Sequence, residues 1–185
     1  MPQDRTRKIV ITGILSAITI FLGLTRWGFW PWFGGISITI MHIPVIIGAV
    51  LEGPVVGLII GLIFGLFSMI QAAVAPNFPT DVWFTNPLLS VLPRLFIGPV
   101  AWLVWRSLKR WPVVGLVGAG LAGSLTNTIL VLTMIGLLGL VPWAALPAIA
   151  VANGIPEAAV SAVLVLAVVA AWRQIRVGRR EGSKL

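Results

Sequence analysis

The sequence has no cysteine, a single histidine, and only 5 acidic residues among its 185. The lack of cysteine excludes a disulfide framework, a thiolate metal site and a cysteine nucleophile. Charged residues of either sign make up 10% of the chain, less than half of the about 25% that soluble domains carry. These shortages exclude an ordinary soluble domain, a disordered chain and a solvated coiled coil.

In their place the sequence has long apolar runs, and 58% of its residues are hydrophobic. A membrane-spanning helix needs about 20 mostly apolar residues, and no alternating pattern indicates a β-barrel. We therefore predict an all-α integral membrane protein, in which residues 1–185 form one bundle of six transmembrane helices. The second run is short and has Pro44 near its start. The six runs are Lys8–Leu24, Ile36–Leu51, Pro54–Ala75, Pro87–Trp105, Val113–Leu140 and Pro147–Trp172.

The basic residues predict how these helices are oriented. Eleven of the 13 lysines and arginines lie at the start of the first run, between the fourth and fifth, or after the sixth. With six spans these regions share one face, and the positive-inside rule places that face, with the short tails 1–7 and 173–185, in the cytoplasm. The net charge of +8 therefore indicates orientation and contact with the lipid bilayer, not a nucleic-acid partner. No small-residue cleavage site follows the first run, so we expect it to be retained and not removed as a signal peptide.

Small residues recur every four positions in several runs, which lets membrane helices approach closely. Gly57, Gly61 and Gly65 form such a stripe in the third run, and similar stripes in the fifth and sixth are expected to face the bundle interior. Gly13 and Ala17 form a pair in the first run. That pair can serve either this bundle or an external partner helix.

Arg94 is a basic residue well inside a predicted span, where an ionisable side chain raises the free energy of membrane insertion. It follows Asn86 and Ser90 at four-residue spacing, so the three are expected on one helix face, with Arg94 roughly 10 Å below the outer end. That position suits contact with an anionic or carbonyl-bearing ligand. An ion pair with Glu157 and capping of broken backbone near Pro93 are the structural alternatives.

The last two runs carry further polar residues. Asn153, Glu157 and Ser161 are spaced four apart in the sixth run, and Glu157 is deep enough that it must be paired, protonated or hydrated. Contact with a ligand and a pair with Arg94 both remain open for this carboxylate. Asn127 lies among serine and threonine in the fifth run, where hydrogen bonding between helices is the simpler interpretation and a pocket wall the other.

His42 lies near the outer start of the second run, and Glu52 follows the end of that run. A structural, hydrogen-bonded His42 is favoured over pocket lining, and no metal site is expected without further ligands. Glu52 is expected at a solvated turn, where Gly53 and Pro54 end one helix and begin the next. The outer loop 25–35 is rich in aromatic residues, among them Trp30 and Trp32. They fit an interfacial belt, or a gate over a ligand that the loop 76–86 could complete.

Motifs of several enzyme classes are missing. The chain has no GxxxxGK[ST] phosphate loop, no HExxH and no serine elbow. We therefore predict that this chain does not itself hydrolyse ATP by the phosphate-loop route, and that it is not an enzyme.

Four stretches, taken in order, resemble the substrate-binding (S) components of energy-coupling factor (ECF) transporters. They are ITIMHIPVIIGAVLEGPVVGLIIGLIFGLFSMIQA, NPLLSVLPRLFIG, SLTNTILVL and NGIPEA. The resemblance covers nearly the whole chain and is to the vitamin-uptake branch that includes pantothenate and hydroxymethylpyrimidine carriers.

The resemblance implies a subunit of the prokaryotic plasma membrane that captures a small vitamin from outside, best guessed as pantothenate, with no cofactor. It implies docking on a transmembrane coupling subunit driven by two cytosolic ATPases, with Gly13 and Ala17 in the place of the family's alanine-rich docking patch. A structural scaffold of the rod-shape MreD type, without small-molecule cargo, is the alternative. The expected substrate-binding residues are Arg94, Asn127, Asn153, Glu157, Ser90, His42, Trp30 and Trp32.

Overall fold

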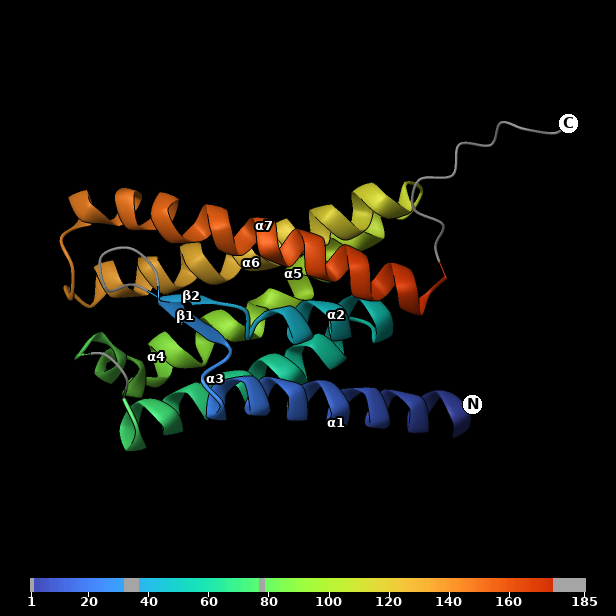
Figure 1. The fold of residues 1–185 in the computed structure, drawn as a ribbon, viewed down its shortest axis with the longest axis horizontal. Coiled ribbons are helices and arrows are strands. Elements are labelled where there is room, and N and C mark those ends of the chain that lie inside the picture. Colours follow the sequence, from blue (N-terminus) through green and yellow to red (C-terminus); the bar gives the residue numbers. More distant parts are fainter. Residues whose placement is uncertain (1, 32–36, 77–78, 175–185) are drawn as a thin grey trace, which may run out of the picture.

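The computed structural model describes residues 2–31, 37–76 and 79–174. Its long helices lie side by side along one axis (Figure 1). Five segments are long and apolar enough to cross a membrane, which confirms five of the six predicted runs as helices of membrane-spanning length. They are α1 (Pro2–Leu24), α3 (Pro54–Val74), the pair α4 (Pro87–Ser90) and α5 (Leu92–Leu108), α6 (Pro112–Leu137), and α7 (Leu146–Trp172) preceded by the short 3-10 helix η3 (Trp143–Ala145).

The second predicted run is not one continuous helix. It begins as strand β2 (Ser37–Thr39), which pairs antiparallel with β1 (Phe29–Pro31), and continues as the ten-residue helix α2 (Ile43–Glu52). β-Branched residues favour the strand, and a proline in the first turn favours a helix start at Ile43. Because extended residues rise about 3.3 Å each, strand and helix together cover more length than the short helix alone.

The fourth run is also interrupted, between α4 and α5 at Val91. Pro93 has no N–H, so it cannot donate to the carbonyl of Leu89 four residues earlier. Asn86 precedes α4 and caps it, since its side chain accepts a hydrogen bond from the Leu88 N–H at 3.0 Å. The predicted helix over this run therefore has a one-residue interruption at Val91, between Ser90 and Arg94.

Helix α2 forms the centre of the bundle. Its residues 43–50 are all buried, and it packs against α1, α3, α5, α6 and α7. The surrounding helices instead expose large apolar side chains, such as Phe21, Ile70 and Val163, as expected for surfaces that face lipid.

Glycine allows the closest of these helix contacts. A Cβ atom added to Gly98 of α5 would lie 2.6 Å from the Cα atom of Gly57 in α3, and one on Gly120 of α6 would lie 2.7 Å from the Cα atom of Ala162 in α7. The stripe in the third run is confirmed as a packed face, because Gly57, Gly61 and Gly65 all meet the backbone of the segment 90–98. Gly13 differs from the other helical glycines of the described chain, since a Cβ there would meet nothing within 4 Å.

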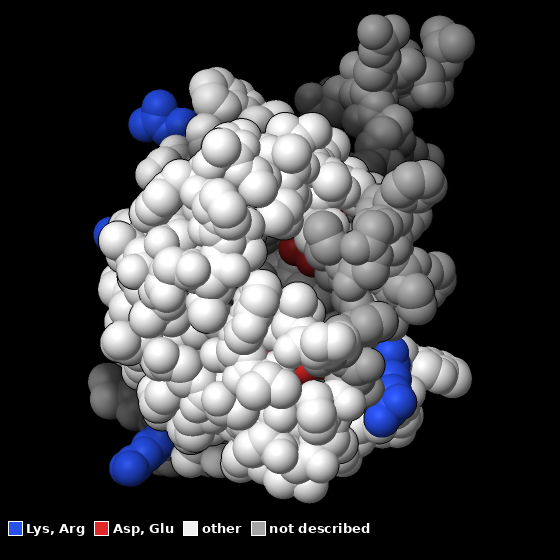
Figure 2. Space-filling model, turned by 90° about the vertical axis from the view of Figure 1, so that its left-hand side faces the viewer, with Lys and Arg blue, Asp and Glu red and all other residues white. Residues whose placement is uncertain are grey.

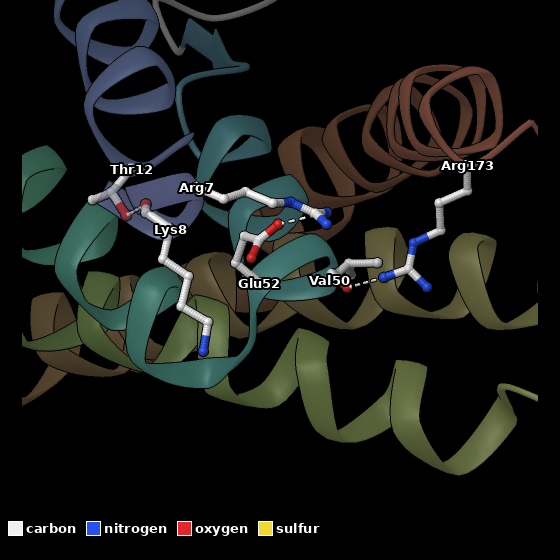
Figure 3. A network of polar contacts seen from close by, with 6 residues as sticks. All are labelled: Arg7, Lys8, Thr12, Val50, Glu52 and Arg173. Atoms are coloured by element: carbon white, nitrogen blue, oxygen red, sulfur yellow. Dashed lines mark hydrogen bonds and ion pairs between the residues drawn. The ribbon is translucent and has the colours of Figure 1, made fainter. Parts of the chain in front are cut away.

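The beginning of α1 and the end of α7 lie at the same end of the bundle (Figure 1). There the Arg7 guanidinium forms an ion pair with Glu52 at 2.8 Å, and Arg173 donates to the Val50 carbonyl at 2.8 Å (Figure 3). Val50 lies in the last turn of α2, whose carbonyls lack partners within the helix. Glu52 is only 6% exposed, so the prediction of a solvated turn is wrong for this side chain.

Candidate functional site

The opposite end of the bundle carries the short helix η2 (Pro79–Thr85) and the connection from α6 to α7. Viewed onto this end, the surface is hollowed near its centre, and acidic side-chain atoms are visible inside the hollow (Figure 2). Several buried polar side chains come together from different elements in this part of the bundle, and each is described below.

Glu157 of α7 is buried and joins three elements. One carboxylate oxygen, Oε1, accepts a hydrogen bond from the backbone N–H of Thr39 in β2 at 2.7 Å. The other, Oε2, lies 3.4 Å from the donating hydroxyl of Thr128 in α6. The carboxylate therefore receives donors from β2 and from α6 while it stands on α7.

His42, just before α2, is also held by α7. Its Nε2 lies 2.7 Å from the hydroxyl of Ser161, and both residues are fully buried. The favoured interpretation of His42 as a hydrogen-bonded structural histidine is consistent with this contact, and the ring nitrogen Nδ1 has no partner.

Arg94 of α5 is 5% exposed and lies between two aromatic rings. Its guanidinium carbon is 5.5 Å from the ring centre of Phe64 and 5.0 Å from that of Phe84, distances suited to cation–π attraction. Its NH1 group donates to the Leu89 carbonyl, the group that Pro93 leaves without its helical partner. Of the structural alternatives considered for Arg94, capping of the broken backbone is the one observed.

Arg94 and Glu157 do not form a direct ion pair with each other. The site therefore holds a buried cation and a buried carboxylate whose direct hydrogen bonds go to other groups.

Besides Nδ1 of His42, three further polar atoms of this region are buried without a hydrogen-bond partner. They are the Nε atom of Arg94 and the Oδ1 atoms of Asn127 and Asn153. A buried polar group without a partner is costly, and in a binding pocket it is ready for a ligand atom. These atoms give the site a cationic donor and two carbonyl acceptors.

The remaining predicted residues are placed as follows. Ser90 is buried, and its hydroxyl donates to the Phe84 carbonyl at 2.6 Å, which ties α4 to η2. Trp30 lies in β1, whereas Trp32 lies outside the described residues. Within the residues that the structure describes, no group of three His, Asp or Glu side chains could hold a metal ion.

Sequence reasoning did not find Thr39, Thr128 and Phe64 as members of the site, and it included Phe84 only within the loop 76–86 that could complete a gate. Thr39 contributes a backbone N–H, which any residue type except proline supplies, so no sequence signal exists for it. Phe64 lies one residue before Gly65, on an apolar stretch, where nothing distinguishes it from other core residues.

Comparison with known proteins decides what kind of protein carries this site. Residues 7–169 match the family "ECF transporter, substrate-specific component". The chain belongs to this family. It is also 29% identical to the pantothenic acid transporter PanT of Lactococcus lactis subsp. cremoris (strain MG1363), in an alignment of 196 residues that covers 95% of this chain and 98% of PanT.

As an S component the protein is a multi-pass membrane protein of the prokaryotic plasma membrane, a transport protein and not an enzyme. S components work with an energy-coupling module. Family membership thus decides between the two functional hypotheses in favour of the carrier and against the structural scaffold.

Proposed function

We propose that this S component binds pantothenate in the hollow beside Glu157 and delivers it inward with the coupling module. The observation that carries the proposal is the buried polar cluster with unpartnered atoms at the hollowed end of the bundle. The similarity to PanT over nearly the full length of both chains supports the choice of ligand. Pantothenate has a carboxylate, an amide and two hydroxyls, and the cluster offers complementary groups.

Arg94 is the proposed partner of the ligand carboxylate. One of its NH groups is used on the Leu89 carbonyl, while Nε has no partner. The side chains of Asn127 and Asn153 would meet the amide and hydroxyls, because each has an unpartnered carbonyl oxygen. The expected roles of Ser90, His42, Trp30 and Trp32 in lining or covering the pocket remain predictions.

The proposed docking face for the coupling subunit is the side of α1 that contains Gly13 and Ala17. Both residues are exposed, and Gly13 has open space where a side chain would be. Since the other helical glycines of the described chain are used for contacts within the bundle, the exposed pair is free to receive another helix closely. The partner we propose is a transmembrane coupling subunit driven by two cytosolic ATPases.

The proposed topology has six crossings and both termini in the cytoplasm. The cation-rich end of the bundle, with Arg7 and Arg173, would face the cytoplasm under the positive-inside rule. The hollowed end would then face outward, where the vitamin is captured. Cysteine accessibility tests this topology, because the natural sequence contains no cysteine. Lys109→Cys should react with a thiol reagent that does not cross the membrane only after the membrane is permeabilised. Thr80→Cys should react with the same reagent in intact cells.

Binding is tested by native mass spectrometry of the purified protein and by titration with pantothenate and with pantothenol, its neutral alcohol analogue. We expect the wild-type protein to prefer pantothenate. A hydrogen bond to a charged group contributes about 1.5–3 kcal/mol, so Arg94→Met should weaken pantothenate binding by about tenfold to a hundredfold and pantothenol binding much less. Ser107→Ala, an exposed change in the same helix, is the control. Saturable binding of neither compound by the wild type would refute pantothenate as the ligand, and equal losses for both compounds would refute the role of Arg94.

A further inference from the structure

The segment that enters α2 is attached to α7 at two points. The Thr39 N–H donates to Glu157 at 2.7 Å, and His42 lies 2.7 Å from the hydroxyl of Ser161. Glu157 and Ser161 are four residues apart in α7, so they lie one above the other on a single face of that helix. The two attachments therefore act on one short stretch of chain, residues 39–42.

The two attachments differ in burial. His42 and Ser161 are fully buried, whereas Glu157 is 5% exposed and its hydrogen bond from Thr39 is partly buried. Hydrogen bonds to a buried charged group are stronger than those between neutral groups, so the bond from Thr39 to the carboxylate is expected to be the firmer of the two. The second carboxylate oxygen already has the hydroxyl of Thr128 nearby.

The partners of Glu157 distinguish it from the other polar residues of the site. Glu157 accepts a hydrogen bond from the Thr39 N–H and lies 3.4 Å from the Thr128 hydroxyl, which is also placed to donate to the Ser124 carbonyl at 3.3 Å. Arg94, Asn127 and Asn153 instead each have a buried atom with no partner, and such an atom gains more from a ligand than a carboxylate that is already bonded to the protein.

We propose that Glu157 and Ser161 are positioning residues, which hold β2 and the start of α2 against α7 and so shape one wall of the site, and that Glu157 is not itself a ligand of the substrate. The other end of α2 is held independently, since Arg173 of α7 donates to the Val50 carbonyl. Loss of Glu157 should therefore loosen residues 37–42 while α2 and the bundle stay in place.

Amide hydrogen exchange tests the attachment without any ligand. In the full-length detergent-solubilised protein, Glu157→Met should speed exchange in a peptide covering residues 37–43 by about tenfold or more, because the buried acceptor of the Thr39 N–H is lost. Glu157→Gln keeps a carbonyl acceptor and should restore most of the protection. Unchanged exchange in Glu157→Met would overturn the proposal.

Ser161→Ala provides a second test in case Glu157→Met does not accumulate in the membrane. Its matched control is Ser124→Ala, the same change at another fully buried serine, whose hydroxyl has no partner. Faster exchange at residues 37–43 in Ser161→Ala but not in Ser124→Ala supports the proposal. Equal behaviour of the two variants contradicts it.

The ligand measurement rests on the proposed function and uses pantothenate and pantothenol. Glu157→Met and Glu157→Gln lose the same charge, so electrostatics should change the ratio of pantothenate to pantothenol affinity equally in both variants. A positioning residue does not touch the ligand, so both compounds should dissociate faster from Glu157→Met than from Glu157→Gln by the same factor. A ratio that differs between the two variants would make Glu157 a ligand-contacting residue and overturn the proposal. If neither compound binds the wild-type protein, the proposed function is refuted. The hydrogen-exchange experiments would still show whether Glu157 and Ser161 hold residues 39–42 in place.

Discussion

Replacing Gly13 by leucine should separate docking from every other property of this S component. Gly13 lies on α1, is exposed, and has no atom within 4 Å of the place where its Cβ would be. Leucine there would extend outward from the bundle and would not press on a neighbouring helix of the same chain. We therefore expect folding and substrate binding to be preserved and transport to be lost.

The expected magnitudes follow from the two surroundings of the new side chain. Within the isolated subunit, a helix gains up to about 0.8 kcal/mol when leucine replaces glycine, so the melting temperature should be unchanged or slightly higher. At a close helix–helix contact with the coupling subunit, the added atoms should cost about 1–3 kcal/mol, as overpacking does in a well-packed core. That corresponds to docking weakened by roughly fivefold to more than a hundredfold.

The assay compares uptake by cells or vesicles containing the complete transporter with ligand binding by the purified subunit. Gly13→Leu should show strongly reduced uptake, reduced recovery of the coupling subunit when the S component is purified, and a ligand affinity within about twofold of wild type. Gly13→Ala is the matched control, since a methyl group on this open face should be tolerated. Normal uptake by Gly13→Leu would refute the assignment of this face to docking.

Three further predictions concern the packing and the cation-rich end. Gly98→Ala should lower the free energy of unfolding by about 1–3 kcal/mol or prevent folding, because the new Cβ would meet backbone at 2.6 Å; denaturation in detergent measures this, and unchanged stability would contradict the packing. Arg173→Met should lower the free energy of unfolding by about 1 kcal/mol, because the Val50 carbonyl at the end of α2 loses its donor. A melting temperature equal to that of the wild type would contradict this prediction. Arg7→Gln should destabilise the protein more than Lys8→Gln, an equal loss of charge at the next residue, because only Arg7 pairs with the buried Glu52; a thermal-shift comparison measures the difference, and equal effects would argue against the ion pair.

Much of the bundle follows from residue types alone, because each membrane helix must satisfy its backbone hydrogen bonds internally and turn apolar side chains to lipid. The five long spans could be predicted for this reason, as could the burial of Arg94 and Glu157. The strand before α2 could not, because residues 37–42 continue directly into the apolar stretch 43–51, and together they read as one helical run. The acceptor that holds β2, the carboxylate of Glu157, is 118 residues away in the sequence.

The candidate site, too, could be predicted only in part. The sequence showed its polar residues through their four-residue spacing, but it did not show which groups they hydrogen-bond. Sequence spacing placed Asn86 and Arg94 on one helix face, whereas Pro93 breaks the helix and gives Arg94 a free carbonyl to cap. A hydrogen bond depends on which backbone groups a break leaves without partners, and only the folded chain determines that.

The sequence by itself determined that this is an integral membrane protein, since the scarcity of charge and the length of the apolar runs exclude a soluble domain; its match to the family model over residues 7–169 identifies it as an S component. Only the tertiary structure decided which helical glycines pack inside and which is open: among the described helices Gly57 meets Gly98, while a Cβ on Gly13 would meet nothing within 4 Å. The physical reason is that a residue's environment is set by the neighbouring helices, and helices distant in the sequence become neighbours only by packing. The same packing brings the Glu157 carboxylate within hydrogen-bond distance of the Thr39 N–H, so that this acidic residue of α7 holds β2 in place.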